Sequence, residues 1–97
     1  MAAFINILIK TKDGYSNPKY VELNRWYGRC DFDGLLMVDT ISRKHFRFYE
    51  RCGKVFFEDD STNGSSVMGI EVHHNSFPVI CGDMLKLDDI PVFVIIR

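Results

Sequence analysis

Residues 42–51 read Ser-Arg-Lys-His-Phe-Arg-Phe-Tyr-Glu-Arg, and this stretch decides the fold class. Side chains of an extended chain alternate between two faces, which places Phe46 and Phe48 together on one face. The opposite face holds the mainly polar set Arg43, His45, Arg47, Tyr49 and Arg51. A clean period of two over these residues predicts a half-buried β-strand.

A helix is the competing interpretation of the segment between Gly34 and Gly53. The stripe that would support it, at helical spacing, consists of Val38, Ile41, His45, Phe48, Tyr49 and Cys52. A strand accounts for both the apolar and the basic residues of the segment, so we expect the strand.

The rest of the chain repeats this pattern in short form. Runs of β-branched, aromatic and aliphatic residues alternate with turns rich in Gly, Pro, Asn and Asp. This spacing predicts an all-β fold, an antiparallel β-sandwich of about eleven strands. The expected strands centre on residues 4–9, 20–23, 26–27, 35–38, 46–49, 55–58, 67–68, 70–72, 79–80, 85–87 and 92–96.

Length and composition limit the possible classes of protein. The chain has 97 residues, 46% of them hydrophobic, which suits one domain with one core. We therefore expect a single domain that spans residues 1–97. The net charge of −1 gives no overall field that would attract nucleic acid.

The cysteines indicate a reducing, intracellular compartment. Three of them, at positions 30, 52 and 81, are an odd number at wide spacing without a C-x-x-C pair, which predicts neither a disulfide framework nor a zinc motif. The N-terminus has no signal-peptide pattern, and no apolar run approaches the roughly 20 residues of a membrane span.

No metal or other cofactor is expected. His73 and His74 are neighbours in a polar turn, and neighbouring side chains on an extended chain diverge. We expect both to be exposed and to share no metal ion.

Three clusters carry the candidate chemistry: Gly28-Arg29, then Ser42-Arg43-Lys44-His45, then Asp59-Asp60-Ser61-Thr62-Asn63-Gly64-Ser65. Each lies where a predicted strand meets a turn, and a sandwich gathers such loops at one end. An arginine fork matches phosphate oxygens, hydroxyls donate further hydrogen bonds, and an Asn amide can hold a peptide backbone. Together these groups predict a site for a phosphate attached to a peptide.

This ordered triple resembles the forkhead-associated (FHA) domain family, whose pattern is Gly-Arg, then Ser-Arg-x-His, then Asp-x-Ser-x-Asn-Gly-Thr. The likeness extends over the whole chain. It implies a β-sandwich that binds phosphothreonine in a partner protein after a kinase has acted, and that catalyses nothing. Ser65 stands where the family usually has Thr.

The resemblance also implies a role for each matching residue. The residues implied to contact the phosphopeptide are Arg29, Ser42, Arg43, Thr62 and Asn63. Those implied to support the site are Gly28 and Gly64, which allow backbone turns, and His45, which holds the loops together. The residue three positions after the phosphothreonine is often read by loops that match Thr40-Ile41 and Asp88-Asp89-Ile90 here. Thr40, Asp88 and Asp89 are therefore possible specificity residues.

Three other functions are compatible with parts of this sequence. Ser42 and His45 resemble a nucleophile and its base, but no oxyanion-type elbow flanks the serine, and we expect the two side chains to face opposite ways. The segment from Ile41 to Lys54 holds five basic residues and one acidic residue, a face that suits a nucleic-acid backbone with Tyr49 as a stacking partner. A phosphate-independent interaction through a flat sandwich face is the third alternative. Direct nucleic-acid contact is not expected.

The C-terminal run Ile90-Pro91-Val92-Phe93-Val94-Ile95-Ile96 is similar to that of FHA domains in forkhead-type transcription regulators. This likeness implies a nuclear location and a role in transcription regulation.

Overall fold

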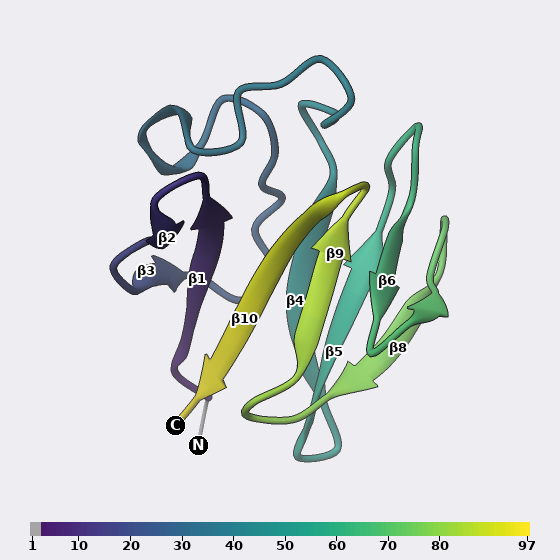
Figure 1. Ribbon diagram of the computed structural model, residues 1–97. Helices are drawn as coiled ribbons and strands as arrows, with labels where there is room; N and C mark the ends of the chain where they lie inside the picture. Colours follow the sequence, from purple (N-terminus) through teal and green to yellow (C-terminus); the bar gives the residue numbers. More distant parts are fainter. Residues whose placement is uncertain (1–2) are drawn as a thin grey trace.

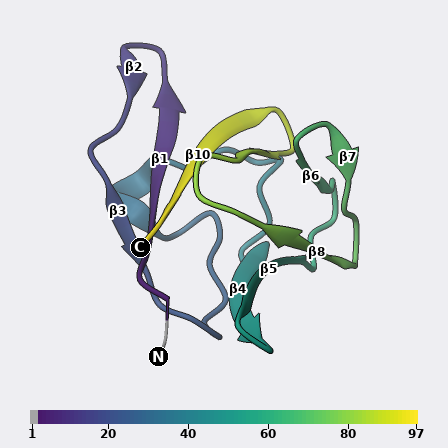
Figure 2. The same cartoon turned by 90° about the horizontal axis from the view of Figure 1, so that it is seen from below.

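The computed structural model describes residues 3–97, which fold as two antiparallel β-sheets packed face to face (Figures 1 and 2). These residues form, in chain order, β1 (Ile5–Thr11), β2 (Gly14–Tyr15), β3 (Lys19–Val21), the 3-10 helix η1 (Phe32–Gly34), β4 (Phe46–Arg51), β5 (Lys54–Asp59), β6 (Ser65–Val67), β7 (Ile70–Glu71), β8 (Ser76–Val79), β9 (Met84–Leu87) and β10 (Ile90–Ile96). The larger sheet has the order β2-β1-β10-β9-β6-β7, and β3 also pairs with β1. The smaller sheet has the order β4-β5-β8.

The all-β fold class is confirmed, with ten strands in the described residues where the sequence predicts about eleven. The strand expected at residues 35–38 is wrong, because this segment forms turns after η1. Phe32, Asp33 and Gly34 all have positive φ, between 55° and 83°, so the chain reaches the apolar run in a left-handed conformation that a strand cannot continue.

Two further boundaries differ from expectation. Residues 26–27 form no strand and make only an isolated bridge between Tyr27 and Phe46. The short strand β2 was not expected, and it pairs with the end of β1 through the register Thr11 to Gly14. Both cases concern strands of one or two residues, which leave too few positions for an alternation to be seen.

The core lies between the two sheets. Phe46 and Phe48 of β4 are at most 1% exposed, which confirms the strand over the helix for this segment. Phe57 of β5 lies with its ring centroid 5.7 Å from that of Phe46 and 5.6 Å from that of Phe48. The buried residues that the larger sheet contributes include Ile5, Ile7, Ile9, Leu85, Leu87, Val92 and Val94.

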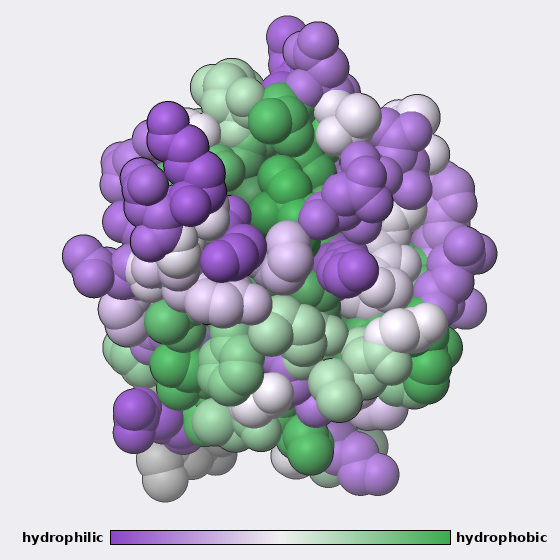
Figure 3. Space-filling view, viewed as in Figure 1, coloured by the Kyte–Doolittle hydropathy of each residue, from purple (hydrophilic) through white to green (hydrophobic). Residues whose placement is uncertain are grey.

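The sandwich has two distinct ends. The loops that carry the three sequence clusters lie at the end opposite the two termini, whereas the β4–β5 hairpin lies at the same end as the termini (Figure 1). On the outer face of the larger sheet, apolar side chains spread over the half nearer the termini and polar side chains flank the other half (Figure 3). Within residues 3–97, no helix is long and apolar enough to cross a membrane.

Candidate functional site

The three sequence clusters converge on one open hollow of about 370 Å³ at the loop end of the sandwich. Its lining residues are Arg29, Asp39, Ile41, Ser42, Arg43, Thr62 and Asn63. All five residues expected to contact a phosphopeptide are in this set. The sequence did not single out Asp39, and it named Ile41 only as part of the possible specificity loop Thr40-Ile41.

Gly28 brings the first cluster against the second. The backbone N–H of Arg29 donates to the carbonyl of Ser42 at 3.1 Å, so the two chain segments lie side by side. A Cβ atom at position 28 would overlap the backbone carbonyl oxygens of Ser42 and Arg43. Gly28 begins a turn, since the Asp31 N–H donates to its carbonyl at 3.0 Å, but its φ is not positive. The feature that requires glycine here is the close approach of two backbones.

Gly64, in contrast, ends a turn that begins at Ser61. Its φ is +91°, a conformation that costs glycine little and other residues much. The Gly64 N–H donates to Ser61 Oγ at 2.8 Å, which closes the turn over Thr62 and Asn63.

Ser42 is fixed from both of the neighbouring loops. Its backbone N–H donates to Nδ1 of His45 at 3.1 Å, and its Oγ accepts a hydrogen bond from the Thr62 N–H at 2.9 Å. The hydroxyl hydrogen of Ser42 is therefore available for an acceptor in the hollow, such as a phosphate oxygen.

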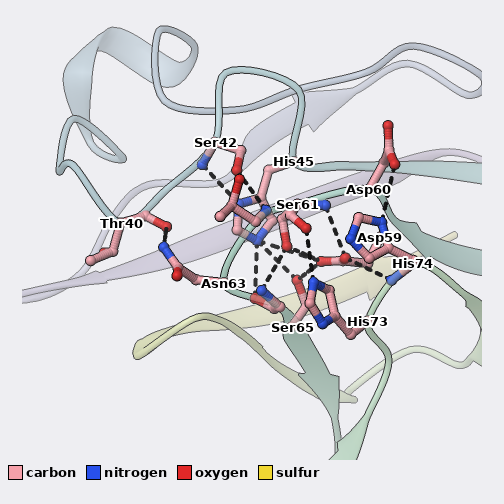
Figure 4. Close-up of polar contacts among 12 residues, drawn as sticks. Thr40, Ser42, His45, Asp59, Asp60, Ser61, Asn63, Ser65, His73 and His74 are labelled. Atoms are coloured by element: carbon pink, nitrogen blue, oxygen red, sulfur yellow. Dashed lines mark hydrogen bonds and ion pairs between the residues drawn. The ribbon is translucent and has the colours of Figure 1, made fainter.

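Asn63 is held across the hollow. Its Nδ2 donates to the carbonyl of Thr40 at 2.8 Å, which fixes the orientation of the amide (Figure 4). The Oδ1 atom and the second N–H of Asn63 stay available to accept from and donate to a peptide backbone. Thr40 thus positions Asn63 through its backbone carbonyl.

His45 connects the second and third clusters beneath the hollow and is fully buried. Because Nδ1 accepts the Ser42 N–H, the proton lies on Nε2, which faces Ser65 Oγ at 3.0 Å and the Gly64 carbonyl at 3.2 Å. Burial lowers the pKa of His45 more strongly than the nearby Asp59 carboxylate raises it. The ring is therefore neutral at pH 7, and its role is to hold the loops.

Asp59, at the end of β5, is the second buried member of this network. Its carboxylate accepts four hydrogen bonds, from the Ser61 and His74 N–H groups and from the Ser61 and Ser65 hydroxyls, at 2.5 to 3.1 Å (Figure 4). Burial by itself raises the pKa of Asp59, but these donors outweigh it and the net pKa is lowered. Asp59 therefore stays ionised inside the protein.

The serine that replaces the usual Thr at position 65 retains the necessary hydroxyl. Ser65 accepts from His45 Nε2–H and donates to Asp59, so its Oγ links the two buried groups. Sequence reasoning placed Asp59, Ser61 and Ser65 in a cluster but assigned them no part in the site. The signal was the Asp-x-Ser spacing, which is typical of a side chain that accepts the N–H two residues on.

The charges at the rim favour an anion. Arg29 and Arg43 make no ion pair with any acidic residue among the described ones, and both line the hollow. Asp39 is the only acidic residue of the lining. Two free guanidinium groups around a serine hydroxyl can bind a phosphate through charge-assisted hydrogen bonds.

A second hollow of about 260 Å³ lies beside the first, and Asn63 belongs to both. It carries two carboxylates, Glu71 and Asp88, and we refer to it as the acidic hollow. Of the three possible specificity residues, Asp88 lines this hollow, Thr40 positions Asn63, and Asp89 lines neither hollow.

His73 and His74 are exposed, as expected, but their rings do not diverge. The φ of His74 is +55°, and this turn stacks the two rings with centroids 4.2 Å apart. With Asp59 they form a group whose potential ligand atoms lie within 4.8 Å of one another. Each member already has a hydrogen-bond partner, since His73 Nε2 contacts the Ser61 carbonyl and His74 Nδ1 contacts Asp60.

Ser42 and His45 are not arranged as a nucleophile and base. The imidazole Nδ1 binds the backbone N–H of Ser42, and Ser42 Oγ binds Thr62. The expectation that the two side chains face opposite ways on a strand is wrong, because both residues precede β4. His45 likewise lies inside the protein, although the alternation pattern had placed it on the outer face.

The buried network predicts a loss of stability in acid that depends on His45. The unfolded chain binds a proton near the ordinary pKa of 6.5, whereas the folded chain binds it only at lower pH, so the free energy of unfolding falls as pH drops below 6.5. The slope should reach at most about 1.4 kcal/mol per pH unit. Urea denaturation at a series of pH values measures it. Below the ordinary Asp pKa of 3.8, protonation of Asp59 removes further stability.

The variant His45→Ala should melt at a lower temperature than the wild type and show a flatter pH dependence between pH 5 and 7. His74→Ala is the matched control, because His74 is exposed and should leave the slope in place. An unchanged melting temperature together with lost ligand binding would instead place His45 among the ligand-contacting residues.

Comparison with known proteins identifies the family. Residues 27–88, which make up more than half of the chain, match the FHA domain family. A solved FHA domain from a structural and functional analysis of phosphothreonine-dependent FHA domain interactions superposes with a TM-score of 0.74 at 19% identity, over 97% of both chains. The N-terminal FHA domain of Rad53p from S. cerevisiae, in complex with a phosphothreonine peptide, gives 0.72 at 21% identity, over 97% of this chain and 94% of that chain.

The FHA domain of the CT664 protein from Chlamydia trachomatis gives a TM-score of 0.72 at 17% identity, over 95% of this chain and 96% of that chain. Identities this low show a shared fold, here a β-sandwich of the same topology class. Because the family match covers the segment from Tyr27 to Asp88, which holds all three clusters, the chain belongs to the FHA domain family.

Proposed function

We propose that the hollow binds phosphothreonine in a partner protein that a kinase has phosphorylated. FHA domains are phosphothreonine-binding interaction modules. The observation that carries the proposal for this chain is the pairing of two free arginines with the Ser42 hydroxyl around one open hollow. No described carboxylate neutralises either arginine, so both are available to a doubly charged anion.

The lining residues other than Asp39 have distinct parts in this proposal. Arg29 and Arg43 bind the phosphate oxygens, and the Ser42 hydroxyl donates a further hydrogen bond. Asn63 holds the peptide backbone, and Thr62 contacts the phosphate or the adjacent peptide. The γ-methyl group of phosphothreonine packs against the turn that begins at Thr62 and the backbone beside Ser42, and the core residue Ile41 anchors that backbone.

The proposed role is recruitment, without catalysis and without a cofactor. His45, beneath the hollow, is bound to the backbone of Ser42 and Gly64 and is not arranged as a general base for the Ser42 hydroxyl. We also propose that residues 1–97 act as one domain and that the protein works in the nucleus in transcription regulation. The nuclear proposal rests on the C-terminal likeness alone, and imaging of the tagged protein in its own cells tests it.

The acidic hollow is proposed to read the ligand after the phosphothreonine. Asn63, the residue proposed to hold the peptide backbone, lines both hollows. A ligand side chain in the acidic hollow would lie near the carboxylates of Glu71 and Asp88. A basic residue three positions after the phosphothreonine would be attracted and an acidic one repelled.

Arg29→Ala is expected to abolish measurable phosphopeptide binding while the fold stays intact. The change removes two charge-assisted hydrogen bonds, worth about 3 to 6 kcal/mol together, at a loop rather than in the core. Isothermal calorimetry measures the affinity and circular dichroism the fold. Arg25→Ala, in the same loop but outside the hollow, is the control with unchanged affinity. Equal affinities of Arg29→Ala and the wild type would remove the phosphate role.

Phosphothreonine should bind more tightly than phosphoserine. The two ligands share phosphate, charge and backbone, so the arginines cannot distinguish them. Burial of the γ-methyl group is worth about 0.8 kcal/mol, and the stiffer torsion of a β-branched residue adds to it. The expected preference is roughly tenfold, or about 1.4 kcal/mol. Titration of matched peptides at physiological salt measures it, and equal affinities would mean that the site reads charge alone.

A lysine three positions after the phosphothreonine should bind about tenfold more tightly than a glutamate there, since two carboxylates line the acidic hollow. The double variant Glu71→Gln/Asp88→Asn should reduce this difference to within about twofold. Asp89→Asn, outside the hollow, is the control that keeps it. A peptide library enriched in acidic residues at this position would contradict the prediction.

A further inference from the structure

The outer face of β4 and β5 carries a row of alternating cations and aromatic rings, away from the core. Its members on the strands are Arg47, Tyr49, Arg51, Lys54 and Phe56, and Trp26 and Lys44 extend it from the adjoining loops. We call this row the basic aromatic strip. Phosphate binding at the hollow does not use any of its residues.

The contacts along the strip are continuous. Lys44 Nζ lies 4.5 Å and Arg47 Cζ 5.0 Å from the ring centroid of Trp26. Arg47 also lies 5.5 Å from the ring of Tyr49, and Arg51 lies 6.0 Å from that ring on the next outward position of the strand. Rings that hold guanidinium groups in this way fix their orientation and leave the N–H groups free for acceptors.

The charge of the strip is only partly balanced. Arg47 Nε pairs with Glu58 at 2.6 Å, and Lys44 pairs with Asp60 at 3.1 Å. Within the described residues, no ion pair is formed by Arg51 or by Lys54, its register partner in the β4–β5 hairpin. This excess of positive charge lies on a chain whose net charge is −1, so the strip is complementary to an acidic ligand.

The strip begins where the phosphate hollow ends. Arg43 lines the hollow, Lys44 follows it in the chain, and β4 then leads to the hairpin at the opposite end of the sandwich (Figure 1). The six extended residues of β4 span about 17 Å, which an extended peptide of about six residues can follow. The acidic hollow takes the other flank of the phosphate site.

We propose that the basic aromatic strip binds an acidic segment of the same partner, on the N-terminal side of the phosphothreonine. The inference rests on the proposed function, because the phosphothreonine anchors the segment at the strip. Carboxylates or further phosphates of the segment accept hydrogen bonds from Arg51 and Lys54 and compete with Glu58 for Arg47.

The geometry favours an acidic peptide over a single-stranded nucleic acid. Base stacking needs open aromatic faces. Here Tyr49 is stacked on Phe56 at 5.3 Å with 10° between the planes and has two arginines over it, and Trp26 has a lysine and an arginine over it. The rings are thus engaged with protein cations, and the strip offers charge rather than stacking surface.

Two phosphothreonine peptides test the proposal. They share the phosphothreonine and the residues after it, and the ten preceding residues are rich in Asp and Glu in one and in Asn and Gln in the other. Calorimetry at low and physiological salt is expected to give about tenfold tighter binding of the acidic peptide, with a smaller ratio at higher salt. The variant Arg51→Glu/Lys54→Glu should remove this ratio and leave the affinity for the neutral peptide unchanged. Lys10→Glu/Lys12→Glu, with the same change of charge outside the strip, should keep the ratio.

The outcomes separate the two proposals. Binding of both peptides by the wild type with equal affinity would overturn the strip and leave the phosphothreonine site standing. Failure of both peptides to bind would overturn the proposed function and, with it, the strip. A labelled oligothymidine that binds the wild type more tightly than the acidic peptide, and that Arg51→Glu/Lys54→Glu releases, would assign the strip to nucleic acid instead.

Discussion

The buried carboxylate of Asp59 is the constraint on which the site depends. Burial of a carboxylate inside a β-sandwich raises the free energy of the folded state unless hydrogen-bond donors surround it. The Asp59 carboxylate accepts four hydrogen bonds. Two of the donors belong to Ser61, which in turn accepts the Gly64 N–H and so shapes the turn that presents Thr62 and Asn63. The Ser65 hydroxyl, which donates to Asp59, also accepts a hydrogen bond from His45 Nε2. The other ring nitrogen of His45 accepts the backbone N–H of Ser42. The hydrogen bonds around one buried charge thus connect the second cluster to the third.

The groups around the hollow are positioned mainly by backbone contacts, and this explains why small residues recur there. Gly28 lets two chain segments approach to a distance that no side chain would allow. The side chains of Ser42 and Asn63 are each held by a single hydrogen bond to a neighbouring loop, which leaves their remaining donors and acceptors available to a ligand. A ligand therefore meets groups that are already ordered, and little conformational entropy is lost on binding.

Sequence reasoning was most successful where a pattern is long and local. The alternation at residues 46–51 predicts β4 because six residues repeat one rule. It failed at residues 35–38, where an apolar run is turned by the left-handed residues before it, since composition does not encode φ. The site was predictable in its polar groups, because their chemistry can be read from the residue types. Glu71 joins it only through the packing of a segment distant in sequence, and Asp39 and Ile41, although close to Ser42, carry no phosphate-binding chemistry that would mark them. The stacking of His73 on His74 follows from one positive φ.

The arrangement of charge on the domain favours one orientation of the bound peptide over the reverse. Five basic residues and one acidic residue lie between Ile41 and Lys54, so the near-zero net charge of the chain conceals a strong separation. The phosphate hollow lies between the basic aromatic strip and the acidic hollow, and each flank repels the charge that the other attracts. A phosphate alone would be held equally well in either orientation of the peptide. With unlike flanks, only one orientation satisfies both, so the same electrostatics that select the partner also fix the direction in which its chain crosses the site.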